Sequence, residues 1–377
     1  MKIAIIQNVT LNDHRSVHSH HVACELSRRG IDVDVIVQKT EEELQYTERP
    51  YRLIELPGET YSIKGQVQFI LKLYHYLKGT KYTIIHAKNP FSSLLPAVLL
   101  RKLGKIDSRI IYDMRGLWIE FGAGTGKFPS LLRHGLEMVE RALMRRCEHV
   151  VAISPALKEV LCSEGIPGGK VTVIIGAGVD IEKIQSLEPA VFSEELADLK
   201  RIGYLGTISV ARESNKIVEA FKTIHRDDCV LLMIGPVIEP QVFDVMTRDT
   251  EKVMLPGFIP QYKALQYLKS CQVAISYHDV ESPAYNVAVP TKILEYMAAG
   301  VPIVATDHTM YRNILEDGRT AVLTGQNPCD FARGIEYALE NPEKCKRMAE
   351  NAYRDVERFS IQKVVDQLME VYKSILK

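Results

Sequence analysis

The sequence lacks the features that mark several large classes of protein. Among its 377 residues no apolar run approaches the length of a membrane span, and the first ten, MKIAIIQNVT, read as a strand without a cleavage pattern. Lys+Arg 47 balance Asp+Glu 47, which argues against a nucleic-acid partner because such binders usually carry a basic excess. The seven cysteines are scattered and form no CxxC pair, so neither a disulfide framework nor a zinc site is expected. We expect a globular, cytoplasmic protein.

Short β-branched runs recur along the whole chain and are separated by segments long enough for helices. Such near-continuous apolar strands are typical of parallel sheets that are covered by helices on both faces. The runs occupy residues 2–6, 33–37, 82–87, 109–114, 149–154 and 171–175 in the first half, and 201–206, 230–235, 252–257, 273–278, 302–307 and 321–325 in the second. The pattern predicts an α/β protein with two Rossmann-like, doubly wound domains.

The division between the two domains is expected in the polar segment 181–200, which contains Pro189. We therefore predict an N-terminal domain at 1–185, a C-terminal domain at 186–357, and a C-terminal helix at 358–377 that can cross back to the N-terminal domain. The two domains are expected to face a central cleft. Because open parallel sheets bind ligands beyond the carboxyl ends of their strands, functional residues are expected in the turns that follow the strands.

The stretch VPTKILEYMAAGVPIVATD (289–307) predicts a short helix that begins at Pro290 and ends at Gly300. Lys292 and Glu295 lie on the face opposite its apolar residues. A lysine in the first turn sits at the positive end of the helix dipole, which costs roughly 0.3–1 kcal/mol unless an anion is near. A solvent-exposed ion pair of Lys292 with Glu295 is an equally acceptable interpretation of this stretch alone.

A second cation follows the strand at 201–206. Gly206 ends this strand, Arg212 lies in the next loop, and Ser214 or Asn215 can cap the helix after it. On its own Arg212 is more simply a solvated loop residue. Together with Lys292, however, it places two cations at strand-to-helix turns of one domain, where a diphosphate is the natural ligand.

These segments resemble glycosyltransferase family 4. The resemblance rests on PTKILEYMAAGVPIVATD, YLGTISVARESNKIVEAF, MIGP and AISPALKEVL…VTVIIGAGVD; it covers nearly the whole chain and is most specific between Gly203 and Asp307. It implies the GT-B fold and a retaining hexosyltransferase that moves a sugar from a nucleoside diphosphate donor to a glycan, lipid-linked or small-molecule acceptor, in polysaccharide or glycoconjugate biosynthesis.

The resemblance also implies roles for individual residues. Glu295 matches the second glutamate of an E-x7-E motif and would bind the donor ribose, for which a carboxylate is suited. Arg212 and Lys292 would act catalytically by stabilising the leaving diphosphate, so that no metal or other cofactor is expected. The other implied donor contacts are Gly206, Thr207, Gly257, Phe258, Pro290 and Thr291.

The sequence departs from the family pattern at four places. Val287 stands where the first glutamate of E-x7-E would fall, and Thr207 stands where an arginine is common. The segment HAK (86–88) replaces an HAH-type pair, and NVTLNDHRS (8–16) replaces a glycine-rich loop.

The turns of the first half are expected to bind the acceptor. Polar groups beside an aromatic side chain are what a sugar or lipid-linked acceptor requires. The simpler interpretation is that Asp13 caps a helix, Arg15 is solvated, and Trp118 packs under its loop. The candidate acceptor contacts are Asn8, His14, Arg15, His86 and Arg115.

Other functions receive less support from the residues. GAGTGKF (122–128) lacks the spacing and the Ser/Thr of a phosphate loop, and GAG (176–178) lacks the rest of a dinucleotide fingerprint. A nucleotide-sugar epimerase of the same fold and a non-catalytic nucleotide-sugar-binding protein remain alternatives. The arginines of 131–150 could contact anionic lipid at the inner face of the membrane, although an ordinary solvated helix also explains them.

Overall fold

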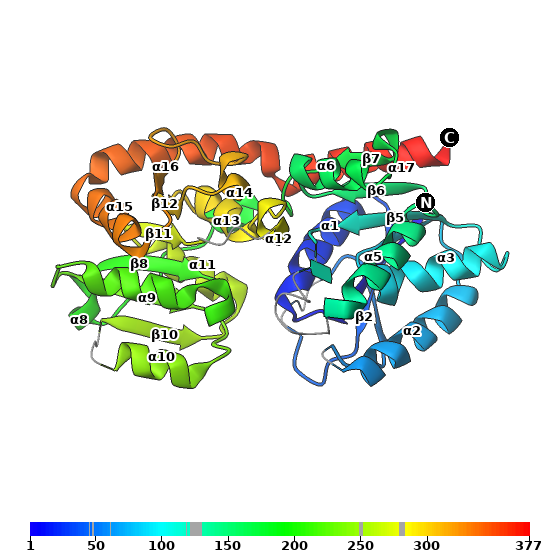
Figure 1. Cartoon of the computed structure of the whole chain (residues 1–377), viewed down its shortest axis with the longest axis horizontal. Coiled ribbons are helices and arrows are strands. Elements are labelled where there is room, and N and C mark those ends of the chain that lie inside the picture. The colour runs from blue at the N-terminus through cyan, green and yellow to red at the C-terminus, as the bar shows by residue number, and fades with distance from the viewer. Residues whose placement is uncertain are drawn as a thin grey trace. The chain divides into compact units, whose positions relative to one another are not determined.

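The computed structural model describes residues 1–44, 46, 49–60, 62–117, 119–120, 130–248, 252–278 and 283–377. The chain forms two compact units. Unit 1 comprises Met1–Gly178, Pro283–Val289 and Ile361–Lys377, and unit 2 comprises Val179–Ser282 and Pro290–Ser360. Figure 1 shows the elements of each unit.

Unit 1 contains a seven-stranded parallel sheet in the order β3-β2-β1-β4-β5-β6-β7. Its strands are β1 (Lys2–Thr10), β2 (Asp32–Gln38), β3 (Arg52–Leu56), β4 (Ile84–Ala87), β5 (Arg109–Met114), β6 (His149–Ala152) and β7 (Val171–Val173). The sequence runs did not indicate β3, an edge strand in which no residue is fully buried. The helices are η1 (His14–Ser16), α1 (Val17–Arg28), α2 (Ile63–Lys78), η2 (Pro90–Leu94), α3 (Leu95–Lys102), α5 (Ser130–Met144), α6 (Pro155–Ser163), η3 (Gly168–Lys170), α12 (Pro283–Asn286) and α17 (Ile361–Leu376).

Unit 2 contains a six-stranded parallel sheet in the order β10-β9-β8-β11-β12-β13. Its strands are β8 (Lys200–Leu205), β9 (Cys229–Ile234), β10 (Val253–Gly257), β11 (Val273–Ser276), β12 (Ile303–Thr306) and β13 (Val322–Thr324). Its helices are α7 (Ile181–Gln185), α8 (Glu194–Ala197), η4 (Val210–Arg212), α9 (Ser214–Thr223), α10 (Pro240–Thr247), α11 (Gln261–Lys269), α13 (Thr291–Ala299), α14 (Thr309–Arg312), α15 (Pro328–Glu340), α16 (Pro342–Val356) and η5 (Glu357–Phe359).

Both sheets confirm the predicted doubly wound α/β class. In each, the strand order reverses once, between β1 and β4 in unit 1 and between β8 and β11 in unit 2. Ligands of such sheets bind at the carboxyl edge where the order reverses. A ligand site is therefore expected at the turns that follow these four strands.

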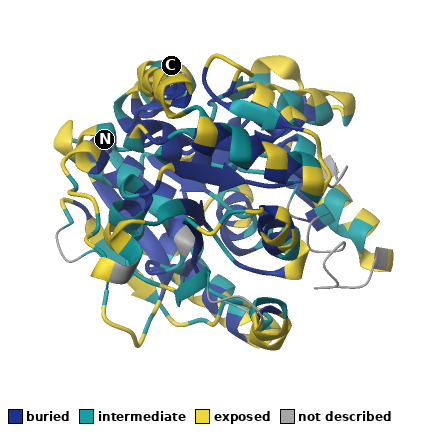
Figure 2. Ribbon diagram, turned by 90° about the vertical axis from the view of Figure 1, so that its left-hand side faces the viewer, coloured by how far each residue is buried: buried dark blue, intermediate teal, exposed yellow. Residues whose placement is uncertain are grey.

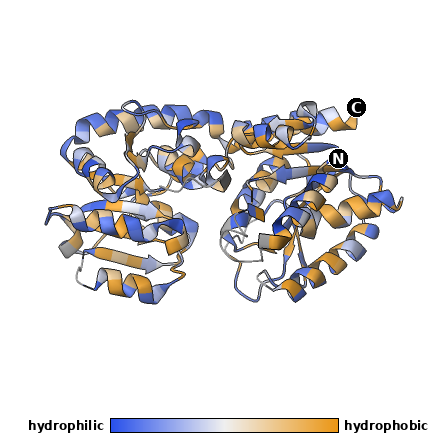
Figure 3. Ribbon diagram, viewed as in Figure 1, coloured by the Kyte–Doolittle hydropathy of each residue, from blue (hydrophilic) through white to orange (hydrophobic). Residues whose placement is uncertain are grey.

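The strands form the cores because helices cover both of their faces. All six residues of β9, CVLLMI, are buried, and dark, buried strands are seen inside the molecule in Figure 2. Figure 3 shows hydrophobic strands beside helices of mixed character. Helix α17 adds Val364, Val365 and Leu368 to the core of unit 1, where they pack with α1. Each such side chain stabilises the fold by about 1.5–3 kcal/mol.

Local signals placed the helix ends with one error. Gly300 ends α13 in the left-handed conformation, as predicted. At the start of α6 the Ser154 side chain accepts a hydrogen bond from Leu157 N. The expectation that Ser214 or Asn215 caps α9 is wrong, because Glu213 occupies that position. Within the described chain no helix is both long and apolar enough to span a membrane.

Candidate functional site

The carboxyl end of β8 closely approaches the neighbouring strand β9. Gly206 has φ +143°, and a Cβ added to Gly235 would lie 2.0 Å from the Gly206 carbonyl oxygen. Neither position can carry a side chain without moving the backbone. The two glycines therefore allow the turn after β8 to pass directly over β9.

Lys292 reaches into this turn from the first turn of α13. Its Nζ lies 4.1 Å from the centre of the Tyr204 ring, and a Cβ on Gly206 would be 3.7 Å from the same atom. Pro290 is the N-cap residue, and no side chain caps α13 within the described chain. The amides of Thr291 and Lys292 thus remain available beside a cation, an arrangement suited to an anion.

Glu295 lies one turn further along α13 and accepts a hydrogen bond from Gln261 Nε2 at 2.7 Å. In the described part of the chain it forms no ion pair with Lys292, and both side chains are half-buried rather than exposed. The alternative of a solvent-exposed ion pair is therefore wrong. Lys292 contacts an aromatic ring and Glu295 an amide, and each keeps part of its hydrogen-bonding capacity.

Their surroundings shift the pKa values of Lys292 and Glu295 to near neutral pH. Burial, and secondly the charge of Arg212, lowers the pKa of Lys292 to about 7, although Glu295 opposes this shift. Burial raises the pKa of Glu295 to about 7 against the opposing effects of Gln261 and Lys292. A diphosphate would favour the charged lysine because it supplies the missing opposite charge.

Arg212 is held by a strained turn. It is followed by Glu213, which has φ 58° and is the one residue other than glycine with a positive φ among those described. The buried Glu213 carboxylate is 3.2 Å from His278 Nδ1, and the backbone N–H and C=O of His278 both bond the Thr306 hydroxyl. The turn after β8 is thereby fixed to the carboxyl ends of β11 and β12.

The predicted base contacts lie at the end of β10. Gly257 has φ +75°, and its carbonyl oxygen accepts a hydrogen bond from Gly235 N at 3.0 Å. Phe258 is 58% exposed, so its ring is accessible to a ligand. Thr207 follows Gly206, and its carbonyl oxygen accepts a hydrogen bond from the Tyr204 hydroxyl at 3.2 Å.

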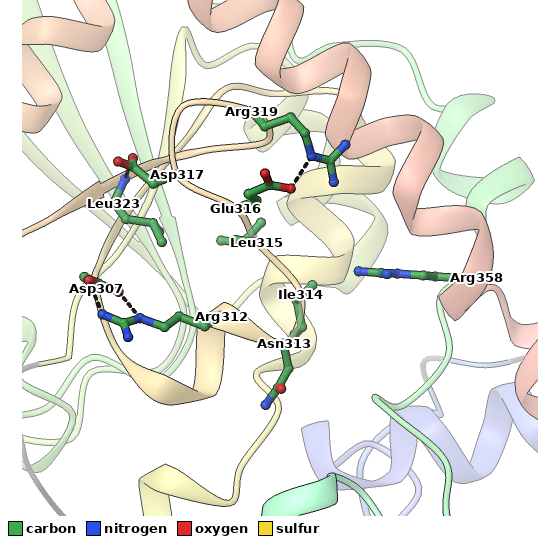
Figure 4. A pocket seen from close by; sticks show the side chains of 10 residues that line it. All are labelled: Asp307, Arg312, Asn313, Ile314, Leu315, Glu316, Asp317, Arg319, Leu323 and Arg358. Carbon is green, nitrogen blue, oxygen red and sulfur yellow. Dashed lines mark hydrogen bonds and ion pairs between the residues drawn. The ribbon is translucent and has the colours of Figure 1, made fainter.

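A separate hollow of about 580 Å³ lies beyond the carboxyl end of β12 and is shown in Figure 4. None of the predicted donor contacts lines it. Two of its three arginines, Arg312 and Arg319, form ion pairs with acidic side chains, and Arg358 stacks on Phe359. Its lining residues are Asp307, Arg312, Asn313, Ile314, Leu315, Glu316, Asp317, Arg319, Leu323 and Arg358.

Unit 1 gathers five ionisable side chains at the carboxyl edge of its sheet. We call this group the Asp113 cluster; it consists of His18, His86, Lys88, Asp113 and Arg115. Asp113 Oδ2 lies 2.7 Å from Lys88 Nζ, 3.2 Å from His86 Nε2 and 3.4 Å from His18 Nε2. Arg115 NH1 lies 3.5 Å from Asp113 Oδ1, and Arg115 NH2 donates to the Gly176 carbonyl at 2.8 Å.

Burial sets the protonation states in the Asp113 cluster. Burial alone would raise the pKa of Asp113, but Arg115, Lys88 and the two histidines hold it well below its usual value. Burial lowers the pKa of Lys88 to about 8, and it lowers the pKa values of His18 and His86. Asp113 is therefore ionised, and the two histidines are neutral at pH 7.

The contacts of His86 fix its tautomer. His86 donates from Nε2 to the Asp113 carboxylate, so its Nδ1 accepts the hydrogen bond from the Tyr372 hydroxyl at 2.7 Å. His18 Nδ1 contacts the Ala177 carbonyl oxygen, and its Nε2 lies 3.4 Å from Asp113 Oδ2. Both ring nitrogens of His86 are thus engaged within the protein.

The other predicted acceptor contacts have different surroundings. Asn8 Nδ2 donates weakly to Gln66 Oε1 at 3.4 Å, and Arg15 forms two hydrogen bonds of 2.8 and 2.6 Å with Asp13. His14 belongs to η1, but its side chain is outside the described residues, as are Trp118 and the segment 122–128. Among the residues that are described, no group of His, Cys, Asp and Glu side chains could hold a metal ion.

Comparison with known proteins gives the family. Residues 16–183 match the family described as Glycosyltransferase Family 4, and residues 191–355 match Glycosyl transferases group 1. The chain belongs to glycosyltransferase family 4. It is 22% identical over 325 residues to EpsD of Bacillus subtilis (strain 168), which is named as a glycosyltransferase, and this match covers 81% of each chain.

Solved glycosyltransferases share the fold over the full length of this family 4 member. Sucrose-phosphate synthase from Thermosynechococcus elongatus has a TM-score of 0.80 at 18% identity, covering 100% of this chain and 99% of that one. Anabaena Alr3699/HepE, solved with UDP and glucose, has a TM-score of 0.77 at 16% identity, covering 99% and 100%. The two parallel sheets and these neighbours establish the GT-B fold.

Several residues near the two edges were not indicated by sequence patterns. Tyr204, Gln261, Glu213, His278 and His18 were all absent from the predicted site. Tyr204 is a buried strand residue like its apolar neighbours, and His18 lies in a helix with no motif around it. Only Glu213 offered a signal, since it directly follows Arg212 in the glycine turn.

Proposed function

We propose that this glycosyltransferase moves a hexose from a nucleoside diphosphate donor to an acceptor hydroxyl with retention of anomeric configuration. The observation that carries the proposal is the position of Lys292, whose Nζ lies at the Gly206 turn beside the first-turn amides of α13. A cation and backbone N–H groups there suit a diphosphate at the point of strand reversal.

Each predicted donor residue then has a chemical role. Lys292 and Arg212 stabilise the negative charge that develops on the leaving diphosphate, and this electrostatic term raises the rate of transfer. Glu295, already an acceptor for Gln261, accepts hydrogen bonds from the ribose hydroxyls. The base lies near Gly257 and the exposed Phe258 ring, which offers a surface for stacking.

The acceptor is proposed to bind the carboxyl edge of unit 1, at Asn8, Arg15 and Arg115. We propose a glycan or a lipid-linked glycan, in which case α5 could contact the inner face of the membrane. No metal is required in this scheme because Arg212 and Lys292 supply the positive charge. Activity is accordingly expected to be unchanged by EDTA.

Calorimetric titration tests the donor site directly. UDP, GDP, ADP and their common sugars are titrated into the wild type, Lys292→Ala and Glu295→Ala, with Lys222→Ala, at an exposed lysine in the last turn of α9, as the control. We expect one nucleoside diphosphate to bind, with at least about tenfold weaker binding in both site variants, as for loss of a charge-assisted contact. Equal binding by all four proteins would refute this donor site.

Turnover distinguishes a transferase from its alternatives. NMR of the reaction with the bound nucleotide sugar follows the donor alone and the donor with acceptor fractions. A new glycosidic bond with the donor's anomeric configuration supports the proposal. Conversion of the donor alone to a C2 epimer would instead indicate an epimerase, and binding without turnover a non-catalytic protein.

A further inference from the structure

The Asp113 cluster contains more positive than negative charge. Lys88 and Arg115 supply two cations and Asp113 supplies the single carboxylate, while burial keeps His18 and His86 neutral. The five side chains have no other charged partner among the described residues. Because an uncompensated buried charge is costly, this excess of positive charge calls for an anion.

We propose that Arg115 forms a subsite for an anionic group of the acceptor, either a phosphate or a carboxylate. The assignment to the acceptor rests on the proposed transferase function, whereas the binding of an anion does not. Arg115 is the contacting residue because its side chain is 21% exposed, while those of Lys88 and Asp113 are 4% and 1% exposed.

Arg115 is also preorganised to bind an oxyanion. Its guanidinium is fixed between the Gly176 carbonyl and Asp113 Oδ1, and no further hydrogen bond engages its five N–H groups among the described residues. A planar guanidinium with a fixed orientation binds carboxylate or phosphate oxygens in pairs and loses little entropy in doing so. The other predicted acceptor cation, Arg15, differs because Asp13 already neutralises it through two short hydrogen bonds.

The position of Arg115 agrees with a ligand contact. It follows β5, which pairs with β4, and the order of the sheet reverses between β4 and β1. Asp113 and its histidines hold the arginine from the protein side, so they act as positioning residues. The arginine itself would touch the substrate.

His18 provides a local reporter of anion binding. Its pKa is lowered first by burial and then by the charges of Arg115 and Lys88. An anion bound at Arg115 offsets those charges and raises the His18 pKa. His18 belongs to unit 1 and Lys292 to unit 2, so the titration is repeated in Lys292→Ala, in which phosphate binding near Lys292 is removed.

The experiment is an NMR pH titration of the histidine ring protons of the full-length chain, with His18 assigned from the spectrum of His18→Gln. Inorganic phosphate, glucuronate and the neutral sugar glucose are the probes. We expect phosphate or glucuronate to raise the His18 pKa and glucose to leave it unchanged. A response to phosphate alone assigns a phosphorylated acceptor, and a response to glucuronate an acidic sugar.

The proposal is tested further with Arg115→Gln, and Arg28→Gln, at an exposed arginine in the last turn of α1, is the matched control. In Arg115→Gln the His18 pKa rises without any anion, and the apparent affinity for the anion falls by about tenfold or more. If Arg115→Gln does not fold, Arg115→Lys is measured in its place. This variant retains the positive charge, and we expect it to show a weaker response to the anion. No response in the wild type, or an undiminished response in Arg115→Gln, overturns the proposal even if nucleotide binds unit 2 as expected.

Discussion

Glu213 accepts a hydrogen bond from His278 Nδ1 over 3.2 Å, and both side chains are buried. The glutamate adopts φ 58°, a conformation that costs a residue with a Cβ about 1–2 kcal/mol. Its neighbour Arg212 is one of the two predicted diphosphate cations. The buried pair thus fixes the turn that carries Arg212 to the strand end that precedes α13.

Removing this carboxylate should weaken donor binding through Arg212. We expect Glu213→Gly, which suits the left-handed backbone, to lower affinity for the nucleoside diphosphate by about threefold to tenfold. Glu213→Ala should show the same loss of affinity and a lower free energy of unfolding, because alanine also bears the backbone strain. In an Arg212→Ala background the glycine substitution should have no further effect; an additive loss would mean that the pair does not act through Arg212.

Donor affinity should be greatest near neutral pH. Lys292 has a pKa of about 7 and must be protonated to bind diphosphate, so affinity should fall as the pH rises above 7. Glu295 has a pKa of about 7 and must be ionised to accept ribose hydroxyls, so affinity should also fall as the pH drops below 7. Calorimetry from about pH 5.5 to 8.5, a range that spans both pKa values, tests the loss of affinity on each side of neutrality.

Two variants distinguish the loss of donor affinity at high pH from the loss at low pH. Lys292→Arg keeps its charge and should remove the loss at high pH, while Glu295→Gln should remove the loss at low pH. Ionisation of the ligand itself is common to all three proteins and cancels in the comparison. A wild-type profile that both variants reproduce would contradict the assignment.

The contact between Gly235 and Gly206 should not tolerate a side chain. The Cβ of Gly235→Ala would lie 2.0 Å from the Gly206 carbonyl oxygen, so the turn beside Lys292 must move. We expect a loss of about 3 kcal/mol in unfolding free energy, measured in urea, and a marked loss of donor affinity. Gly318→Ala, with φ +70° and open space around it, is the control and should cost about 1–2 kcal/mol without affecting the donor.

The hydrogen bond from Tyr372 to His86 should stabilise unit 1. Tyr372→Phe keeps the buried ring but leaves His86 Nδ1 without its 2.7 Å partner, so we expect a loss of about 1–3 kcal/mol in unfolding free energy. Tyr353→Phe, on the exposed side of α16, should change stability by less than about 0.5 kcal/mol. Equal urea midpoints for both variants would show that the hydrogen bond contributes nothing.

Sequence patterns located most strands because buried parallel strands are apolar on both faces. They missed β3, whose residues RLIEL lie at the sheet edge and are only partly buried, so its pattern is weaker. Local sequence signals also located Gly300 at the end of α13, where the left-handed backbone conformation favours glycine. It misplaced the cap of α9, because the conformation of Glu213 depends on a partner 65 positions away.

The sequence by itself determined the fold class, the family resemblance and the position of Lys292 and Glu295 on one face of a short helix. These follow from periodicity, turn residues and spacing, which are local properties of the chain. Only the tertiary structure placed Lys292 over Tyr204, Glu295 beside Gln261, and His18, His86, Lys88 and Arg115 around Asp113. Their charge states depend on burial and on neighbours from distant segments, and neither is encoded by local spacing.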